Sequence, residues 1–345
     1  MGSKNHNHKM RSRSHPFPIF AGVALLGAIT YGAAVAYPVE RTAVPGSAQS
    51  IERAMPRSLL LGGLPQRRAT PISFVAVSSV AMLQRTFEAA DFTLSPIRRG
   101  YETVPRLLLS TLPGDYHEIE QVDLRKRLFF KTVLPLVLRV NEEIMNERRR
   151  LVGLIAILEA GHDLKSADSA WLERLAERYQ TSSGEFATLL RRVDAISPAL
   201  ALAQSVEESG WGRSRFARNG NALFGQRVWA EGAGLVPAAR EAGEVFEVRA
   251  FERLIDSVRA YALNLNRHPA YADFRVIRAN QRATDVALDP YALAETLIGY
   301  SERRESYVET LKSIIRANRL EQFEVARLSP RPLPLLPGFD RTASR

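Results

Sequence analysis

The chain of 345 residues contains no cysteine and only six histidines. Without cysteine there can be no disulfide, no thiolate nucleophile and no zinc site built on thiolates. The histidines are scattered, and no two of them stand at metal-ligand spacing within a helix. Their positions are His6, His8, His15, His117, His162 and His268. The sequence therefore predicts no metal site and no cofactor.

Lysine is also scarce, with six residues against 41 arginines, and the formal net charge is +10. A basic excess favours an anionic neighbour such as nucleic acid, a membrane surface or an acidic polymer. The arginines alternate with glutamates in helical segments, and no RNA-binding or zinc-finger pattern accompanies them, so nucleic acid is not expected. An anionic polymer or a genome-wide preference for arginine would explain the excess. No feature of the sequence indicates a protein partner.

Charge is absent from residues 16–37, which directly follow a basic stretch without acids. As a helix this run would span a bilayer, with its basic flank in the cytoplasm. It ends in Ala34-Val35-Ala36, a pattern that signal peptidase could cleave. A retained anchor and a cleaved signal are both open. Either one would place the remainder outside the cytoplasm, anchored in the inner membrane or released into the periplasm.

Two flanking regions lack clear periodicity. Residues 38–105 are interrupted by proline and glycine, which predicts a linker with one short helix near 77–90. Residues 321–345 are rich in proline and are expected to be extended or disordered. The region between them, 106–320, is expected to form one domain.

Helical periodicity dominates that domain. Apolar residues recur at helical intervals through 123–161, where Pro135 should kink or break the helix and Gly161 should end it. Another helix should begin at Ser197-Pro198, with serine as its cap and proline in its first turn, and end at Gly210. Further helices are expected over residues 166–180, 182–196, 253–267, 290–300 and 306–323.

Residues 225–252 differ, since they are rich in glycine and contain short alternating runs typical of a β-hairpin or three short strands. The expected fold class is mainly α (α+β), a helical domain with a small β-hairpin lobe.

The chemistry is suggested by "QSVEESGWGRSRFARNGNALFG", in which two acids end a helix. Cleavage of a glycosidic bond needs a carboxylic acid that stays protonated near neutral pH, and apolar surroundings provide one by raising its pKa. Glycines beside Trp211 would allow a sharp turn and a close approach of a sugar. Helical spacing does not distinguish Glu207 from Glu208, and both could simply be solvated acids.

This stretch resembles the signature of the bacterial peptidoglycan glucosaminidases, in particular their Bax-like branch. The resemblance continues through "WLERLAERY", "VFEVRAFERLIDSVRAYALNLNRHPAYADFR" and "IGYSERRESYVETLKSIIRANRL", and it covers about residues 106–319. It implies a lysozyme-like fold, with a helical lobe and a small β lobe around a glycan groove. It also implies that Glu208, which precedes Ser-Gly-Trp-Gly, is the general acid.

The resemblance implies two further catalytic positions. Family members often place a second acid in the β lobe, where this sequence matches poorly. Glu247 is the preferred candidate for this second acid and Glu244 is the next. Glu244 is also a candidate for binding substrate, and Glu231 and Glu241 stay open. Tyr300 matches an aromatic position that lines the family's active site, where it would orient the substrate.

Three residues of the signature are candidates for binding substrate, each with a structural alternative. Trp211 could contact sugar or hold the loop to the helix, Phe224 could equally be a buried aromatic, and Asn221 could bond sugar hydroxyls or cap the turn.

The expected activity is that of an endo-β-N-acetylglucosaminidase that cleaves peptidoglycan strands. Participation by the acetamido group of the substrate would make a second acid unnecessary. The alternatives are a lytic transglycosylase, which also uses a single glutamate, and a wall-binding or scaffold module without activity.

Overall fold

The computed structural model describes residues 73–237, 245–284, 286–332 and 341–343. The basic stretch and the uncharged run 16–37 lie outside these residues, so the expected anchor or signal stays a prediction. Across the described part of the chain, no helix is both long and apolar enough to cross a membrane.

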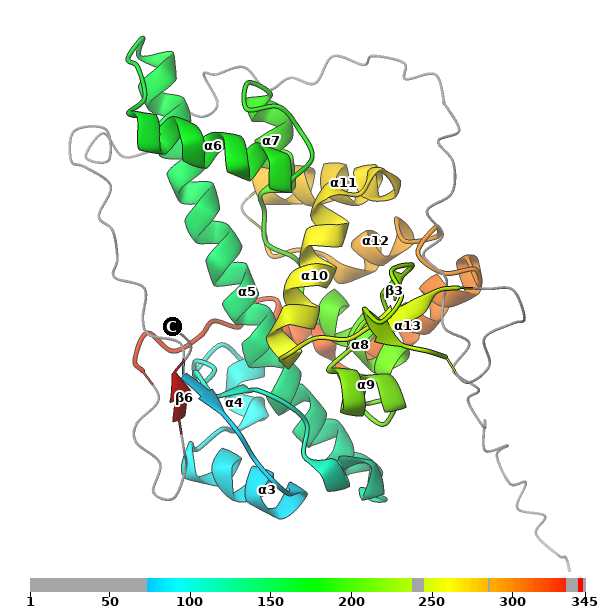
Figure 1. The fold of residues 1–345 in the computed structure, drawn as a ribbon. Coiled ribbons are helices and arrows are strands. Elements are labelled where there is room, and N and C mark those ends of the chain that lie inside the picture. Colours follow the sequence, from blue (N-terminus) through cyan, green and yellow to red (C-terminus); the bar gives the residue numbers. More distant parts are fainter. Residues whose placement is uncertain (1–72, 238–244, 285, 333–340, 344–345) are drawn as a thin grey trace, which may run out of the picture.

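The secondary structure is mostly helical, with two small sheets (Figure 1). The α-helices are α3 (Val80–Ala89), α4 (Leu94–Arg98), α5 (Val122–Glu159), α6 (Ser166–Arg178), α7 (Phe186–Arg192), α8 (Pro198–Ser209), α9 (Arg215–Gly220), α10 (Leu254–Arg267), α11 (Ala272–Ala283), α12 (Pro290–Glu295) and α13 (Glu305–Asn318). The 3₁₀ turns are η1 (Gly114–Glu118), η2 (Pro269–Tyr271) and η3 (Leu320–Phe323). The strands are β1 (Ser73–Val75), β2 (Leu108–Leu109), β3 (Arg227–Val228), β4 (Gly234–Leu235), β5 (Glu247–Arg249) and β6 (Arg341–Ala343).

Helix α5 runs the length of the molecule, with α6 and α7 at one end and α3 and α4 at the other (Figure 1). The helix is continuous through Pro135, so the expected break is absent. Proline removes one hydrogen bond from a helix. Nearly every side chain of α5 between Leu128 and Val140 is buried, however, and this packing keeps the helix intact.

Helix α8 lies in the centre and packs against α5, α12, α13 and η3. It begins as the sequence predicts, because the Ser197 hydroxyl accepts a hydrogen bond from the Leu200 amide at 3.0 Å and Pro198 occupies the first turn. It ends at Gly210, whose φ of 57° is left-handed. Its residues from Pro198 to Val206 are buried, so the end that carries Glu207 and Glu208 is fixed by the core.

The small β lobe is confirmed. It is an antiparallel sheet in which β5 lies between β3 and β4, with Val228 opposite Glu247 and Leu235 opposite Val248. A Cβ atom at Gly234 would lie 2.1 Å from the carbonyl oxygen of Val248, so only glycine allows this close pairing. The glycine-rich composition noted in the sequence therefore serves strand packing.

The prediction of a linker over 38–105 is wrong for its described part. Strand β1 pairs in parallel with β2 and antiparallel with β6, and Phe74, Phe87 and Phe92 belong to the same hydrophobic core as α5. The 321–345 tail likewise contributes Phe323 to the core and β6 to this sheet. The folded unit therefore begins at least 30 residues before 106, as its first described strand starts at Ser73. These short strands pair between segments far apart in the chain, so no local pattern marks them.

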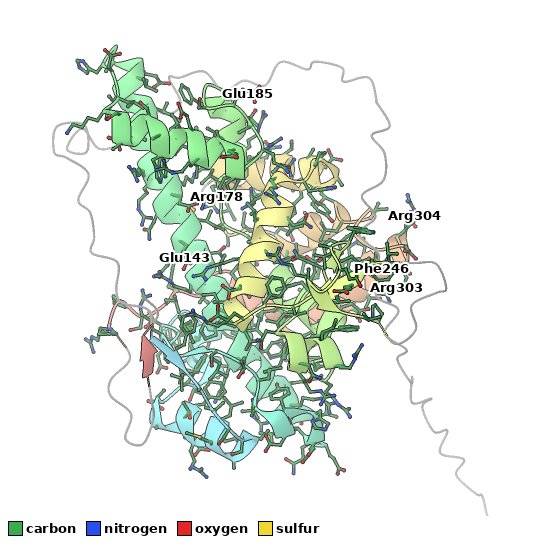
Figure 2. The ribbon with its side chains drawn as sticks, viewed as in Figure 1. Glu143, Arg178, Glu185, Phe246, Arg303 and Arg304 are labelled. Carbon is green, nitrogen blue, oxygen red and sulfur yellow. The ribbon has the colours of Figure 1, made fainter. Side chains whose placement is uncertain are left out.

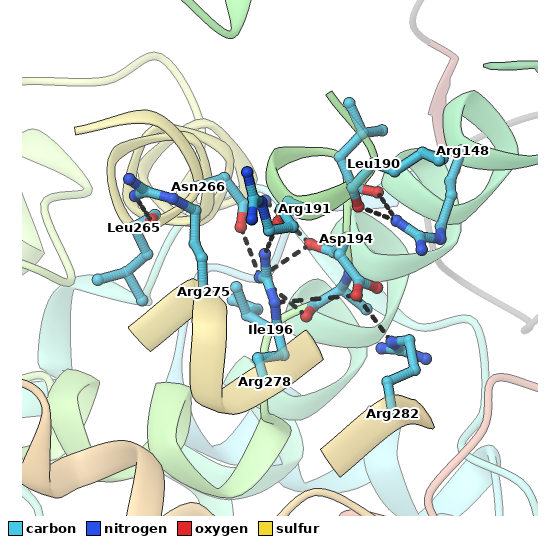
Figure 3. A network of polar contacts seen from close by, with 12 residues as sticks. Arg148, Leu190, Arg191, Asp194, Ile196, Leu265, Asn266, Arg275, Arg278 and Arg282 are labelled. Atoms are coloured by element: carbon cyan, nitrogen blue, oxygen red, sulfur yellow. Dashed lines mark hydrogen bonds and ion pairs between the residues drawn. The ribbon is translucent and has the colours of Figure 1, made fainter. Parts of the chain in front are cut away.

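Much of the arginine excess is used inside the fold (Figure 3). Arg278 is fully buried and donates to the Asn266 side chain at 2.6 Å and to the Arg191 carbonyl at 2.7 Å. The buried carboxylate of Asp194 accepts from Nε of Arg282 at 2.8 Å. These contacts join α7, α10 and α11, so these arginines are structural and do not form a polymer-binding surface.

Candidate active site

Glu208 lies in the last turn of α8 and is partly exposed. Its Oε1 accepts a hydrogen bond from the Tyr307 hydroxyl of α13 at 2.9 Å. Burial of the carboxyl raises its pKa from 4.5 to about 7; the Tyr307 hydrogen bond opposes this rise, nearby Glu207 adds to it, and Arg303 opposes it. Glu208 is therefore a carboxyl that holds its proton close to neutral pH, which is what a general acid requires.

Glu207 has a different environment, although it is the adjacent residue. Its Oε1 pairs with Nη2 of Arg303, which lies in the loop between α12 and α13 (Figure 2). The structure thus separates the two acids that helical spacing could not: Glu207 is ion-paired, while Glu208 contacts a neutral donor.

A chain of buried polar groups extends behind Glu208, and the sequence analysis did not identify it. The Tyr307 hydroxyl accepts from Nε2 of Gln204 at 3.0 Å, and Oε1 of Gln204 accepts from the Tyr261 hydroxyl at 2.6 Å. Gln204 precedes Glu208 by four residues and so shares its face of α8. A buried glutamine at that spacing was the available signal, but its tyrosine partners come from distant helices.

Tyr300, the expected substrate-orienting phenol, is 2 % exposed. Its ring stacks on Tyr307, with centroids 5.5 Å apart and an interplanar angle of 7°, and lies 5.9 Å from the ring of Tyr271. Its hydroxyl is buried and has no hydrogen-bond partner among the described residues. Tyr300 therefore lies one ring behind the residue that contacts Glu208. A direct role in orienting substrate stays a prediction.

Trp211 packs against α5, which favours its structural alternative. Its ring meets those of Phe129 and Phe130 edge to face at 5.9 and 5.4 Å, and Nζ of Lys126 lies 5.3 Å from its centroid. A Cβ atom at Gly212 would lie 3.1 Å from Leu112 and from Tyr116. The Gly-Trp-Gly turn thus packs closely against α5, against η1 and against Leu112, which precedes η1. A contact between Trp211 and a sugar stays a prediction.

The other two signature residues are also structural in this geometry. Phe224 is 1 % exposed and stacks on Tyr261 at 3.9 Å, which favours its alternative as a buried aromatic; a contact with substrate stays a prediction. Asn221 ends α9 at a φ of 51° and donates to the carbonyls of Phe251 and Glu252 at 3.0 and 3.1 Å. It caps the turn and ties it to the segment after the β lobe, which was one of the two roles expected for it.

Glu247, the preferred second acid, is 6 % exposed on β5. Its Oε1 accepts from the Gly232 amide at 3.1 Å and its Oε2 from the Gly234 amide at 2.8 Å. Both oxygens thus hold the β3–β4 turn, an arrangement that favours a structural role. Glu244 lies outside the described residues.

The β lobe reaches the loop that follows α12. Arg227 of β3 stacks over the Phe246 ring at 3.9 Å, and its Nη2 lies 3.9 Å from Oε1 of Glu302. Glu302 is the neighbour of Arg303, which pairs with Glu207. Figure 2 shows Phe246 and Arg303 on this side of the molecule. The lobe and the loop therefore lie beside the end of α8 that presents Glu208.

The described residues contain no cluster of three or more acidic or histidine side chains that could hold a metal ion. The chemistry that the arrangement supports directly is proton transfer by Glu208.

Comparison with known proteins identifies the family. Residues 184–320 match the family described as mannosyl-glycoprotein endo-beta-N-acetylglucosaminidase. The chain is 34% identical to the Protein bax of Escherichia coli (strain K12) over 201 residues, which cover 56% of this chain and 70% of that protein. The chain belongs to the glucosaminidase family, in its Bax-like branch.

Among solved structures, the chain is similar to the catalytic domain of the autolysin Auto from Listeria monocytogenes. The match has 14% sequence identity and a TM-score of 0.27, and it covers 47% of this chain and 89% of that one. The family assignment rests on the sequence similarity to Protein bax, together with the family match over residues 184–320, which include Glu208, Trp211 and Tyr300.

Proposed function

We propose that this glucosaminidase is a peptidoglycan hydrolase, an endo-β-N-acetylglucosaminidase with Glu208 as its general acid. The observation that carries the proposal is a carboxyl whose pKa is raised to about 7, mainly by burial, at the end of a helix fixed in the core. Such a group is about half protonated at pH 7 and largely protonated below it, so it can protonate the leaving oxygen of a glycosidic bond. Membership of the glucosaminidase family supports the same reaction class.

The route after protonation need not involve a second carboxylate. Glu247 is 6 % exposed and each of its oxygens accepts from a backbone amide, so little of the carboxylate is accessible to a water that a general base would have to activate. We therefore assign Glu247 to holding the β lobe. The positive charge that develops on the sugar would be stabilised by the acetamido group of the substrate itself, a route that some glycosidases use.

The substrate implies the location. Peptidoglycan lies outside the cytoplasmic membrane, so the catalytic domain would be exported, with residues 16–37 as its anchor or cleaved signal. The inner membrane or the periplasm is thus the proposed location.

The test uses the full chain, purified in mild detergent and incubated with purified peptidoglycan. Mass spectrometry of the soluble fragments identifies the bond that is cut. New reducing N-acetylglucosamine ends that disappear in Glu208→Gln would support the proposal, while Glu207→Gln, the adjacent acid, should retain them. Anhydro-muramyl products would identify a lytic transglycosylase. Binding without products would identify a wall-binding module and contradict the proposal.

A further inference from the structure

We propose that Tyr261, Gln204 and Tyr307 form a hydrogen-bond chain of fixed direction that reserves Oε1 of Glu208 as an acceptor, so that the transferable proton is carried by Oε2. The three are positioning residues, since they act on substrate only through Glu208. The inference rests on the proposed function for its catalytic meaning, but the hydrogen-bond direction itself can be tested without any substrate.

Each group in the chain has a defined donor and acceptor inventory. Gln204 offers one carbonyl oxygen and one NH₂ group, and each tyrosine offers one hydroxyl proton. The three contacts measure 2.6 Å from Tyr261 to Gln204, 3.0 Å from Gln204 to Tyr307 and 2.9 Å from Tyr307 to Glu208. All three lie within the normal range for hydrogen bonds between nitrogen or oxygen donors and oxygen acceptors.

The direction of the hydrogen bonds follows from the acceptor that is available to the Tyr261 hydroxyl proton. Its hydroxyl proton has one acceptor among the described residues, Oε1 of Gln204. If the Gln204 amide were reversed, its NH₂ group would face Tyr261 and the tyrosine proton would be left without an acceptor. Tyr261 is 1 % exposed and Gln204 is fully buried, so water does not replace the lost partner. A buried donor without an acceptor is costly, and the reversed arrangement is therefore disfavoured.

The fixed amide in turn fixes Tyr307. Because the Gln204 NH₂ group donates to the Tyr307 hydroxyl, the tyrosine proton is directed to Oε1 of Glu208. Were Oε1 protonated instead, two protons would compete for one contact and the Tyr307 proton would have no acceptor among the described residues. Oε1 therefore accepts in both ionisation states of Glu208. The proton that the acid transfers is left on Oε2.

The hydrogen-bond chain from Tyr261 to Glu208 also limits how far burial can raise the pKa of Glu208. A hydrogen bond donated to a carboxylate stabilises its charged form. Tyr307 supplies this bond from a buried position, whereas Arg303, a cation whose charge also acts on Glu208, is paired with Glu207. Without the tyrosine donor, Glu208 would lose its proton only at higher pH and would be a poorer proton donor at neutral pH.

The experiment compares full-length wild type with Tyr307→Phe and Tyr261→Phe. The titration of the Glu208 carboxyl is followed by ¹³C NMR on glutamate-labelled protein, with Glu208→Gln to assign the signal, alongside the pH dependence of kcat/KM on peptidoglycan. We expect Tyr307→Phe to move the Glu208 titration and the alkaline limb upward by about one pH unit. Tyr261→Phe should move both in the same direction by less, because the freed amide can then reverse.

Tyr179→Phe is the matched control, since Tyr179 is also buried and its hydroxyl contacts a different glutamate, Glu147, at 3.4 Å. It should leave the titration of Glu208 unchanged. Lower activity in Tyr307→Phe with an unmoved titration would mean that the ring only packs, and would overturn the proposal. If Tyr307→Phe does not fold, the titration of the Glu208 carboxyl in Tyr261→Phe tests the proposal in its place. An inactive wild type would refute the proposed function while the NMR titration still tests the chain.

Discussion

A partly exposed carboxyl with a raised pKa lies at each end of α8: Glu324, which follows η3, at its start and Glu208, in its last turn, at its end. Only Glu208 has the surroundings of an active site. At the N-terminal end, Glu324 accepts from the Ser197 hydroxyl and from the Ala199 amide, and burial raises its pKa to about 8. At the C-terminal end, Glu208 accepts from a phenol, and its pKa is raised to about 7.

The difference lies in the partners of the two acids. Glu324 bonds the cap and first turn of α8, and it thereby ties η3 to the start of the helix. Glu208 bonds a single side chain, and it lies next to the Gly-Trp-Gly turn and the ion pair that joins α8 to the loop after α12. A raised pKa therefore does not by itself mark a catalytic acid. The placement beside the β lobe distinguishes Glu208.

The largest expected effect comes from removing the acid itself. Glu208→Gln keeps the shape and the Tyr307 contact but cannot donate a transferable proton. Release of muropeptides should fall by about 10²- to 10⁴-fold, the range typical of general acid catalysis. Circular dichroism should show an unchanged fold. Activity within a few-fold of wild type would mean that another group protonates the leaving oxygen.

Removal of the Glu324 carboxyl should lower stability and leave activity nearly unchanged, the opposite of the effect expected for Glu208→Gln. Glu324→Ala leaves the Ser197 hydroxyl and the Ala199 amide without their shared acceptor. The free energy of unfolding should fall by about 1–3 kcal/mol, as expected when a buried donor loses its partner. Denaturant titration measures this loss. Activity per folded molecule should stay close to wild type, and a large loss of activity at full stability would assign Glu324 a catalytic role.

The stability of the protein should depend on pH through both acids. Each has a folded-state pKa above the ordinary value of 4.5, so the folded state binds protons more tightly than the unfolded state. Their contribution is fully present below the unfolded pKa and is lost as pH rises to about 7 for Glu208 and about 8 for Glu324. Thermal unfolding from pH 4 to 9 should show this decline. Glu208→Gln and Glu324→Gln should each make it shallower, and an unchanged slope in both would contradict the raised pKa values.

The smallest effect is expected from Glu207→Gln. It removes a partly exposed ion pair with Arg303, which is worth about 0–1 kcal/mol in stability. It also removes a negative charge that raises the pKa of Glu208, so the alkaline limb of activity should move slightly to lower pH. A pH–activity profile measured beside wild type tests the direction. A shift to higher pH would show that the charge of Glu207 does not act on Glu208 as described.

Local signals in the sequence predicted the helical frame well. The cap at Ser197 and the left-handed end at Gly210 are short-range features, and both define α8 as expected. The small β lobe followed from glycine and alternation. The equally short strands β1, β2 and β6 differ in that their pairing joins segments far apart in the chain. Local periodicity cannot report such contacts.

The candidate site was only partly predictable, because some of its contacts also join segments far apart in the chain. The family motif distinguished Glu208 from Glu207, whereas helical spacing could not. Tyr307 and Tyr261 reach Gln204 from helices about 103 and 57 residues further along the chain, and no local pattern marks them. For Trp211 and Phe224 the sequence left a sugar contact and a packing role open, because a motif of aromatic residues and glycines looks the same in both cases; their packing in the structure favours the second role.

The central claim is that Glu208 acts as a protonated acid at neutral pH. The most direct test is the pH dependence of kcat/KM for release of reducing N-acetylglucosamine ends by the full-length wild type. The account predicts full activity on the acid side and an alkaline limb at about pH 7, the pKa of Glu208 in the free protein. Activity that stays flat from pH 6 to 9 would show that no acid with this pKa takes part, and would contradict the assignment.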